Sequence, residues 1–124
     1  MSKALVVDDS RAVRMLLSKT LRDIGYEVSE AGDGRAALNL IVQDKYALDL
    51  VLADWNMPEM NGLELVKAVR QDPELDPLVV VMVTTETEID QMAAALEAGA
   101  NEYVMKPFTK DILVGKLQLA GIAV

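Results

Sequence analysis

Short apolar runs and amphipathic stretches take turns along the whole chain. The runs 4–7, 49–53 and 78–83 are rich in Val, Leu and Ala, which is typical of strands that are covered on both faces. After each run, apolar residues recur at spacings of three and four, the pattern of an amphipathic helix. Strands that alternate with helices predict a parallel sheet with helices on both faces, so we expect an α/β fold.

Two further strands complete the predicted sheet. Residues 26–31 alternate between polar and apolar, which favours a position near the sheet edge, and residues 102–105 form a short fifth strand. The run 78–83 is the most apolar in the chain and is the best candidate for a central strand. No change of composition divides the sequence, so we expect a single domain over residues 1–124.

The helices are predicted by their caps and their apolar stripes. Asn61 with Glu64, and Thr87 with Asp90, have the spacing of a capping box, and Thr109 can cap the last helix. The sets predicted to face inward are Val13, Leu17, Leu21 and Ile24 in the first helix, and Ile89, Met92, Ala93 and Leu96 in the fourth. The set predicted to lie on the outer face of the first helix is Arg11, Arg14, Ser18 and Arg22.

Composition excludes several kinds of chemistry. The chain has no Cys and no His, so it lacks disulfides, thiolate nucleophiles, His-based acid–base catalysis and His-ligated metals. Its formal net charge of -8 argues against nucleic-acid binding. No signal peptide or membrane-spanning stretch is visible, and we therefore expect a cytoplasmic protein that does not associate with membranes.

Polar residues gather where the predicted strands end. In an open parallel sheet, ligands bind at the carboxyl ends of the strands. Three carboxylates that meet there would raise one another's pKa, and a divalent cation such as Mg²⁺ removes that penalty. The residues at the strand ends are Asp8, Asp9, Asp54, Thr84, Thr85 and Lys106.

These residue types suit phosphoryl transfer. A bound cation and the ammonium of Lys106 would neutralise the charge of a phosphoryl group, and the carboxylate of Asp54 can act as the nucleophile. The hydroxyl of Thr84 can donate a hydrogen bond to a phosphoryl oxygen. Taken singly, each residue is more often a turn former, a helix cap or a solvated side chain, but together they favour a phosphoacceptor site.

Five stretches carry a resemblance to a known family over nearly the whole chain: 7–10, 54–58 with Gly62, 83–84, 99–100 and 103–108. They resemble the receiver domain of two-component response regulators, and most of all the stand-alone chemotaxis regulators. The resemblance implies a doubly wound, flavodoxin-like parallel sheet of five strands in the order 2-1-3-4-5. It also implies that the protein is a signalling phosphoacceptor and not an enzyme with a separate substrate.

The resemblance implies a role for each site residue. Asp54 would be the phosphoacceptor, and Lys106 would contact the phosphoryl group beside a cis bond to Pro107. Thr84 and Tyr103 would form a switch pair, in which Tyr103 turns inward as Thr84 moves. The Mg²⁺ ligands would be Asp8 through water, Asp9, Asp54 and the main-chain carbonyl of Asn56. The residues that would tune access and dephosphorylation are Asn56, Thr85 and Glu86, and the resemblance predicts fast self-dephosphorylation.

The implied partners are a sensor histidine kinase or a histidine phosphotransfer protein as donor, and an output protein that binds the helix 4, strand 5 and helix 5 face. We expect a monomer, with the arginines of the first helix as a contact for an acidic partner. Thr85 is larger than the residue usual in the family, and Glu86 and Glu88 are acidic where the chemotaxis relatives often carry lysines. A phosphorelay intermediate or a phosphate sink therefore stays open beside a motor regulator.

Two functions of other classes are also open on the residues alone. A flavodoxin-like FMN carrier would need a Ser/Thr/Gly-rich phosphate loop after the first strand, where Asp8 and Asp9 would repel the phosphate. An aspartyl-phosphate phosphatase would carry its nucleophile in an Asp-x-Asp pattern at the end of that strand, and this pattern is absent. A third possibility is a receiver fold used only for protein interaction. Such a protein would not need the complete set of acceptor residues, so the intact set argues against this function.

Overall fold

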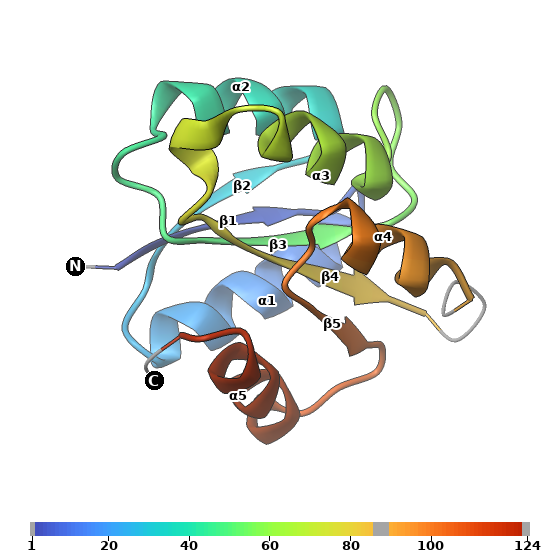
Figure 1. Cartoon of the computed structure of the whole chain (residues 1–124). Coiled ribbons are helices and arrows are strands. Elements are labelled where there is room, and N and C mark those ends of the chain that lie inside the picture. The colour runs from blue at the N-terminus through green and yellow to red at the C-terminus, as the bar shows by residue number, and fades with distance from the viewer. Residues whose placement is uncertain (1, 86–89, 123–124) are drawn as a thin grey trace.

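The computed structural model describes residues 2–85 and 90–122. Its sheet has five parallel strands in the order β2-β1-β3-β4-β5, as the resemblance implied (Figure 1). The middle strand is β3, and β4, which we expected to be central, is the interior strand beside it. The strand bounds are β1 (Lys3–Val7), β2 (Glu27–Ala31), β3 (Leu50–Asp54), β4 (Val79–Thr84) and β5 (Glu102–Met105).

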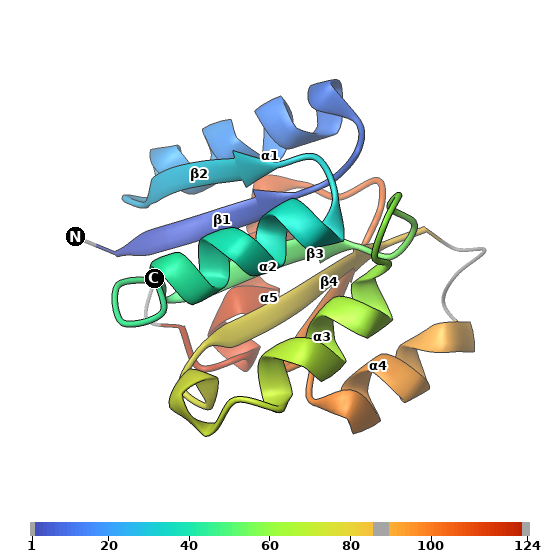
Figure 2. The same cartoon turned by 90° about the horizontal axis from the view of Figure 1, so that it is seen from above.

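Helices cover both faces of this sheet. Helices α1 and α5 lie on one face, and α2, α3 and α4 lie on the other (Figures 1 and 2). None of the helices within the described residues is long and apolar enough to cross a bilayer. The helix bounds are α1 (Arg11–Asp23), α2 (Gly34–Gln43), α3 (Gly62–Arg70), α4 (Met92–Ala98) and α5 (Lys110–Leu119), with a 3-10 turn at Pro73–Leu75 between α3 and β4.

The sheet separates two layers of core, because successive side chains of a strand point to opposite faces. In β1, Leu5 and Val7 belong to the cluster beneath α2, α3 and α4, and Ala4 and Val6 belong to the cluster against α1 and α5. All five residues of β3 are buried. This double coverage explains why the interior strands are continuous apolar runs, while only the last residue of the edge strand β2 is buried.

Side chains cap the helices that begin at the site end of the sheet. The predicted capping box of Asn61 and Glu64 is confirmed, and Thr109 caps α5. Ser10 caps α1, so this helix begins directly after the acidic pair that ends β1. The predicted capping box of Thr87 and Asp90 includes a residue outside the described part of the chain.

Two predicted helix faces are wrong in part. Ser18 is fully buried, and Arg14 is only half-exposed, so the outer face of α1 does not carry the predicted set. In α4, Met92 and Ala95 are buried, whereas Ala93 and Leu96 are exposed. The run from Met92 to Leu96 is apolar on every side, so residue spacing alone does not single out the buried face.

Candidate functional site

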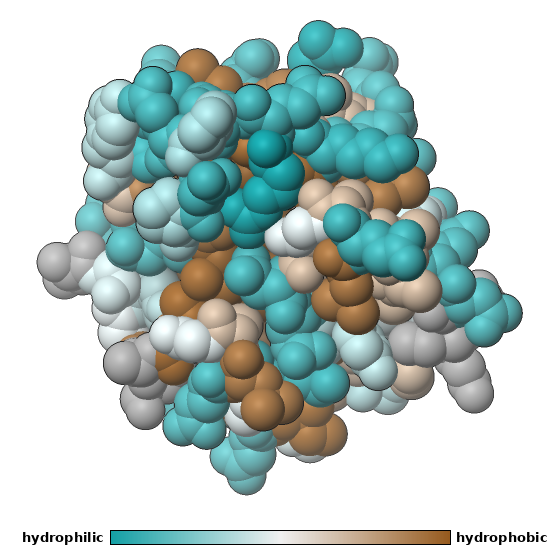
Figure 3. Space-filling view, viewed as in Figure 1, coloured by the Kyte–Doolittle hydropathy of each residue, from teal (hydrophilic) through white to brown (hydrophobic). Residues whose placement is uncertain are grey.

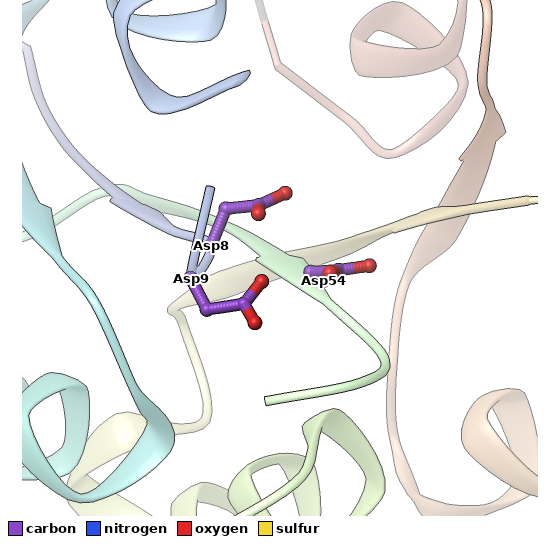
Figure 4. A group of neighbouring side chains, drawn as sticks. All are labelled: Asp8, Asp9 and Asp54. Atoms are coloured by element: carbon purple, nitrogen blue, oxygen red, sulfur yellow. The ribbon is translucent and has the colours of Figure 1, made fainter. Parts of the chain in front are cut away.

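Three carboxylates meet at the carboxyl end of the sheet. Asp8 and Asp9 follow β1, and Asp54 is the last residue of the neighbouring strand β3. One carboxylate oxygen from each lies within 4.8 Å of the others, and the three side chains extend to the same side (Figure 4). Asp8 is 1% exposed and Asp54 is 7% exposed, while Asp9 is open to solvent. The structure therefore brings together the three carboxylates that the sequence predicted to converge.

Lys106 places a positive charge against two of these carboxylates. Its Nζ lies 3.0 Å from Asp8 Oδ2 and 3.4 Å from Asp54 Oδ1. The peptide bond to Pro107 is cis, as the resemblance implied, and the Lys106 main-chain N–H donates to the carbonyl of Thr84. Burial lowers the pKa of Lys106, but the hydrogen bond that it donates to Asp8 and the charges of Asp54 and Asp8 raise the pKa more, so the ammonium stays protonated.

Asp8 is held in place by residues at the start of α1. Asp8 Oδ1 accepts a hydrogen bond from the main-chain N–H of Ser10 at 2.8 Å. The guanidinium of Arg14 donates to the main-chain carbonyl of Asp8 at 2.6 Å and pairs with Glu30 on β2 at 3.3 Å. The sequence pattern did not indicate this role, because its polarity placed Arg14 on the outer face of the helix. One feature of the sequence could have indicated it. The helix begins at Arg11, only three residues after Asp8, so the side chains of its first turn can reach the backbone of Asp8.

Asp54 is fixed by its own backbone neighbours. Its Oδ1 accepts a hydrogen bond from the N–H of Trp55 at 2.9 Å, and the carbonyl of Trp55 accepts one from Gly62 at 2.9 Å. A Cβ atom at Gly62 would lie 2.5 Å from the carbonyl oxygen of Asp54, so only glycine fits there. The loop from β3 to α3 is therefore closed tightly around the carboxylate. Asn56 lies in this loop and is exposed.

The predicted switch residues lie on β4 and β5, the two strands that follow β3 in the sheet. Thr84 ends β4, is fully buried, and donates its hydroxyl to the carbonyl of Thr85 at 3.2 Å. Tyr103 lies on β5, is half-buried, and packs against the cluster beneath α2, α3 and α4. Thr85 is half-buried after the strand, and Glu86 lies outside the described residues.

Comparison with known proteins places this arrangement in a family. The sequence model of the response regulator receiver domain matches residues 4–118. The chain belongs to the response regulator receiver domain family. Within that family it is 43% identical to the chemotaxis protein CheY of Pseudomonas aeruginosa, over 94% of this chain and 93% of the relative. It is also 43% identical to CheY1 of Helicobacter pylori, over 94% of both chains.

Solved structures agree with this membership. The chemotaxis response regulator CheY4 of Vibrio cholerae superposes with a TM-score of 0.84 at 41% identity, over 97% of this chain and 98% of that one. A response regulator receiver domain from Clostridium thermocellum gives a TM-score of 0.88 at 25% identity. The chain is thus a CheY-like receiver domain of a two-component system. This membership favours the receiver function over an FMN carrier or an aspartyl-phosphate phosphatase.

The donor set of this receiver fits the metal of its family. Receiver domains bind Mg²⁺, a cation that prefers oxygen ligands and keeps several waters. Three carboxylate oxygens within 4.8 Å of one another, two of them on buried residues, supply such ligands. Asp9 is exposed, which leaves room for water around the ion. The acidic cluster therefore fits a Mg²⁺ site.

Proposed function

We propose that residues 1–124 act as one receiver domain that accepts a phosphoryl group on Asp54. The observation that carries the proposal is the convergence of three carboxylates with Lys106, whose Nζ lies 3.4 Å from Asp54 Oδ1. A nucleophilic carboxylate, a cation site and an ammonium are the parts that phosphoryl transfer needs. Asp8, Asp9, Asp54 and the main-chain carbonyl of Asn56 are the proposed ligands of Mg²⁺.

The phosphodonor would be a phosphohistidine on a sensor histidine kinase or a histidine phosphotransfer protein, since the chain itself has no His. An oxygen of Asp54 attacks phosphorus, the bond from phosphorus to the imidazole nitrogen breaks, and its electron pair stays on that nitrogen. Bound Mg²⁺ supplies positive charge to the phosphoryl oxygens. Lys106 would add its positive charge beside the phosphoryl oxygens. Its Nζ lies 3.0 Å from Asp8 Oδ2 and holds that carboxylate in position.

Phosphorylation would then bias a two-state element. The phosphorylated side chain carries a charge of about -1.5 to -2, where the free carboxylate of Asp54 carried a charge of -1. Thr84 would donate its hydroxyl to a phosphoryl oxygen, and Tyr103 would move into the space that Thr84 leaves. The output would be a change in affinity at the surface of α4, β5 and α5, where apolar side chains are exposed among polar ones (Figure 3). The large exposed apolar residues on these elements are Leu96, Met105, Ile112 and Leu119.

The biological setting we propose is chemotaxis and flagellar motility, because relatives that match 94% of this chain are chemotaxis proteins. A phosphorelay intermediate or a phosphate sink is the alternative, and the acidic stretch that includes Glu86, Glu88 and Asp90 favours it over direct contact with a motor. We further propose a cytoplasmic monomer without nucleic-acid or membrane partners, in which Asn56, Thr85 and Glu86 set the rate of self-dephosphorylation.

Trp55 provides a direct test, because it is the only Trp and adjoins Asp54. Trp55 is 7% exposed, and its main-chain N–H donates a hydrogen bond to the Asp54 carboxylate. We expect its fluorescence to respond to Mg²⁺ and then to acetyl phosphate or beryllofluoride. Asp54→Asn should keep the fold and lose the second response. A wild-type protein that shows the Mg²⁺ response alone would contradict the phosphoacceptor role.

A further inference from the structure

The side chain of Tyr103 is contacted by residues from both faces of the sheet. It lies on β5, an edge strand, and pairs in register with Met82 of β4. Its side chain packs against the core cluster beneath α2, α3 and α4. Lys116 belongs to α5, which covers the opposite face, and yet its Nζ lies 4.3 Å from the centroid of the Tyr103 ring. The Lys116 side chain therefore passes over the open edge of the sheet.

A carboxylate completes this contact. Glu102 precedes Tyr103 on β5, and its Oε1 lies 3.5 Å from Lys116 Nζ. The same oxygen accepts a hydrogen bond from the main-chain N–H of Tyr103 at 3.0 Å. Glu102 thus holds the ammonium above the ring while it is tied to the backbone of the residue that carries the ring. The side chains of Lys116 and Glu102 are 28% and 19% exposed, so solvent screens the contact only in part.

We propose that Lys116 is a positioning residue that holds the Tyr103 ring in the orientation seen here and so favours the resting state of the receiver. The inference rests on the proposed function, in which Tyr103 moves when Asp54 is phosphorylated. The proposed movement toward the space left by Thr84 would take the ring away from the Lys116 ammonium, and the cation–π contact would then stabilise only the state before the movement. A contact made in one state alone shifts the equilibrium by its own free energy.

The size of the effect follows from the kind of contact. A partly exposed cation–π pair corresponds to a shift of roughly two- to fivefold in a two-state equilibrium. Loss of the Lys116 charge should therefore raise the activated fraction of unphosphorylated protein by that factor. Arginine makes the same kind of contact, so Lys116→Arg should keep the wild-type equilibrium.

The experiment observes the ring itself in the whole chain. Selective carbon-13 labelling of tyrosine gives ring signals from three residues, Tyr26, Tyr46 and Tyr103, which Tyr→Phe variants assign. Spectra are compared for the wild type, Lys116→Met, Lys116→Arg and the control Lys110→Met, with Mg²⁺ and with or without beryllofluoride. Lys110 lies on the same helix and is exposed, so the control removes a charge without touching the ring.

We expect beryllofluoride to move the Tyr103 signal of the wild type. In Lys116→Met without beryllofluoride, the signal should already lie part of the way toward that position, whereas the other two variants should match the wild type. If the wild type responds and Lys116→Met is not displaced, the role of Lys116 is overturned while the switch stands. If the Tyr103 signal of the wild type does not respond, the proposed switch fails, and the role of Lys116 fails with it.

Discussion

Lys106 lies between two carboxylates that would otherwise repel each other. Burial lowers its pKa, but the hydrogen bond to Asp8 and the charges of Asp54 and Asp8 raise it above the ordinary value of 10.5. A raised pKa in the folded state means that the charged lysine stabilises the fold below pH 10.5 and that this contribution is lost as the pH rises through the folded pKa. The contribution is therefore complete at neutral pH.

We predict that Lys106→Met lowers the free energy of unfolding of the metal-free protein by about 1–3 kcal/mol at neutral pH, the usual loss for a hydrogen bond to a charged group. Urea unfolding measures the change, with Lys110→Met as a control for charge. The difference from the wild type should narrow when the pH exceeds 10.5. A difference that is constant from neutral to alkaline pH would show that the ion pairs are not its source.

Ser18 is a buried polar residue on α1. Its Oγ has no hydrogen-bond partner within the described residues, and its side chain is fully buried. An unsatisfied hydroxyl costs free energy when it is taken out of water, and alanine has the higher helix propensity. We predict that Ser18→Ala leaves the fold unchanged and raises the free energy of unfolding by up to about 1 kcal/mol. Thermal unfolding tests this, and a clear loss of stability would mean that the hydroxyl has a partner.

At the scale of elements, one side chain joins the end of α3 to the segments around it. The guanidinium of Arg70 donates to the carbonyls of Leu75, Leu78 and Gly99 at 2.7 to 2.9 Å. It also donates to the side-chain oxygen of Asn101 at 2.9 Å, and that oxygen accepts a second hydrogen bond from the main-chain N–H of Val80 in β4. Burial lowers the pKa of Arg70, and its ordinary value is so high that the group remains charged. Arg70 therefore anchors the carboxyl end of α4, where Gly99 has a positive φ.

We predict that Arg70→Met lowers the free energy of unfolding by about 2–4 kcal/mol, because several carbonyls lose their donor at once. Arg70→Lys should recover little, since an ammonium cannot reproduce the planar fork of donors. Lys67→Met is the matched control, because Lys67 is exposed on the same helix. Urea unfolding measures all three variants. Full recovery by lysine would show that charge, and not the set of carbonyl bonds, explains the loss.

At the scale of the whole molecule, the sequence predicted the features that depend on repeated pattern. Continuous apolar runs indicated covered parallel strands, and a polar residue at the end of each run indicated where a ligand would bind. Those inferences concern the backbone and the ends of strands, which a parallel sheet brings to one edge. The strand order came from the resemblance to receivers, because alternation alone does not fix it.

Contacts between side chains of distant elements were beyond the sequence. Arg14 and Ser18 are polar residues on an amphipathic helix, and polarity alone assigned both to its outer face. Lys116 reaches Tyr103 over the edge of the sheet, and no spacing along the chain indicates that approach. The buried face of α4 was also ambiguous, because its residues are apolar on every side. Packing decides such positions, and packing is a property of the assembled layers.

The central claim is that Asp54 takes up a phosphoryl group, and the intact mass of the protein tests it most directly. Wild-type protein is incubated with Mg²⁺ and acetyl phosphate, with Asp54→Asn and a chelator-treated sample as controls. We predict that the wild type gains the mass of one phosphoryl group, located by fragmentation to Asp54, and that neither control gains it. No gain in the wild type, or an equal gain in Asp54→Asn, would contradict the account.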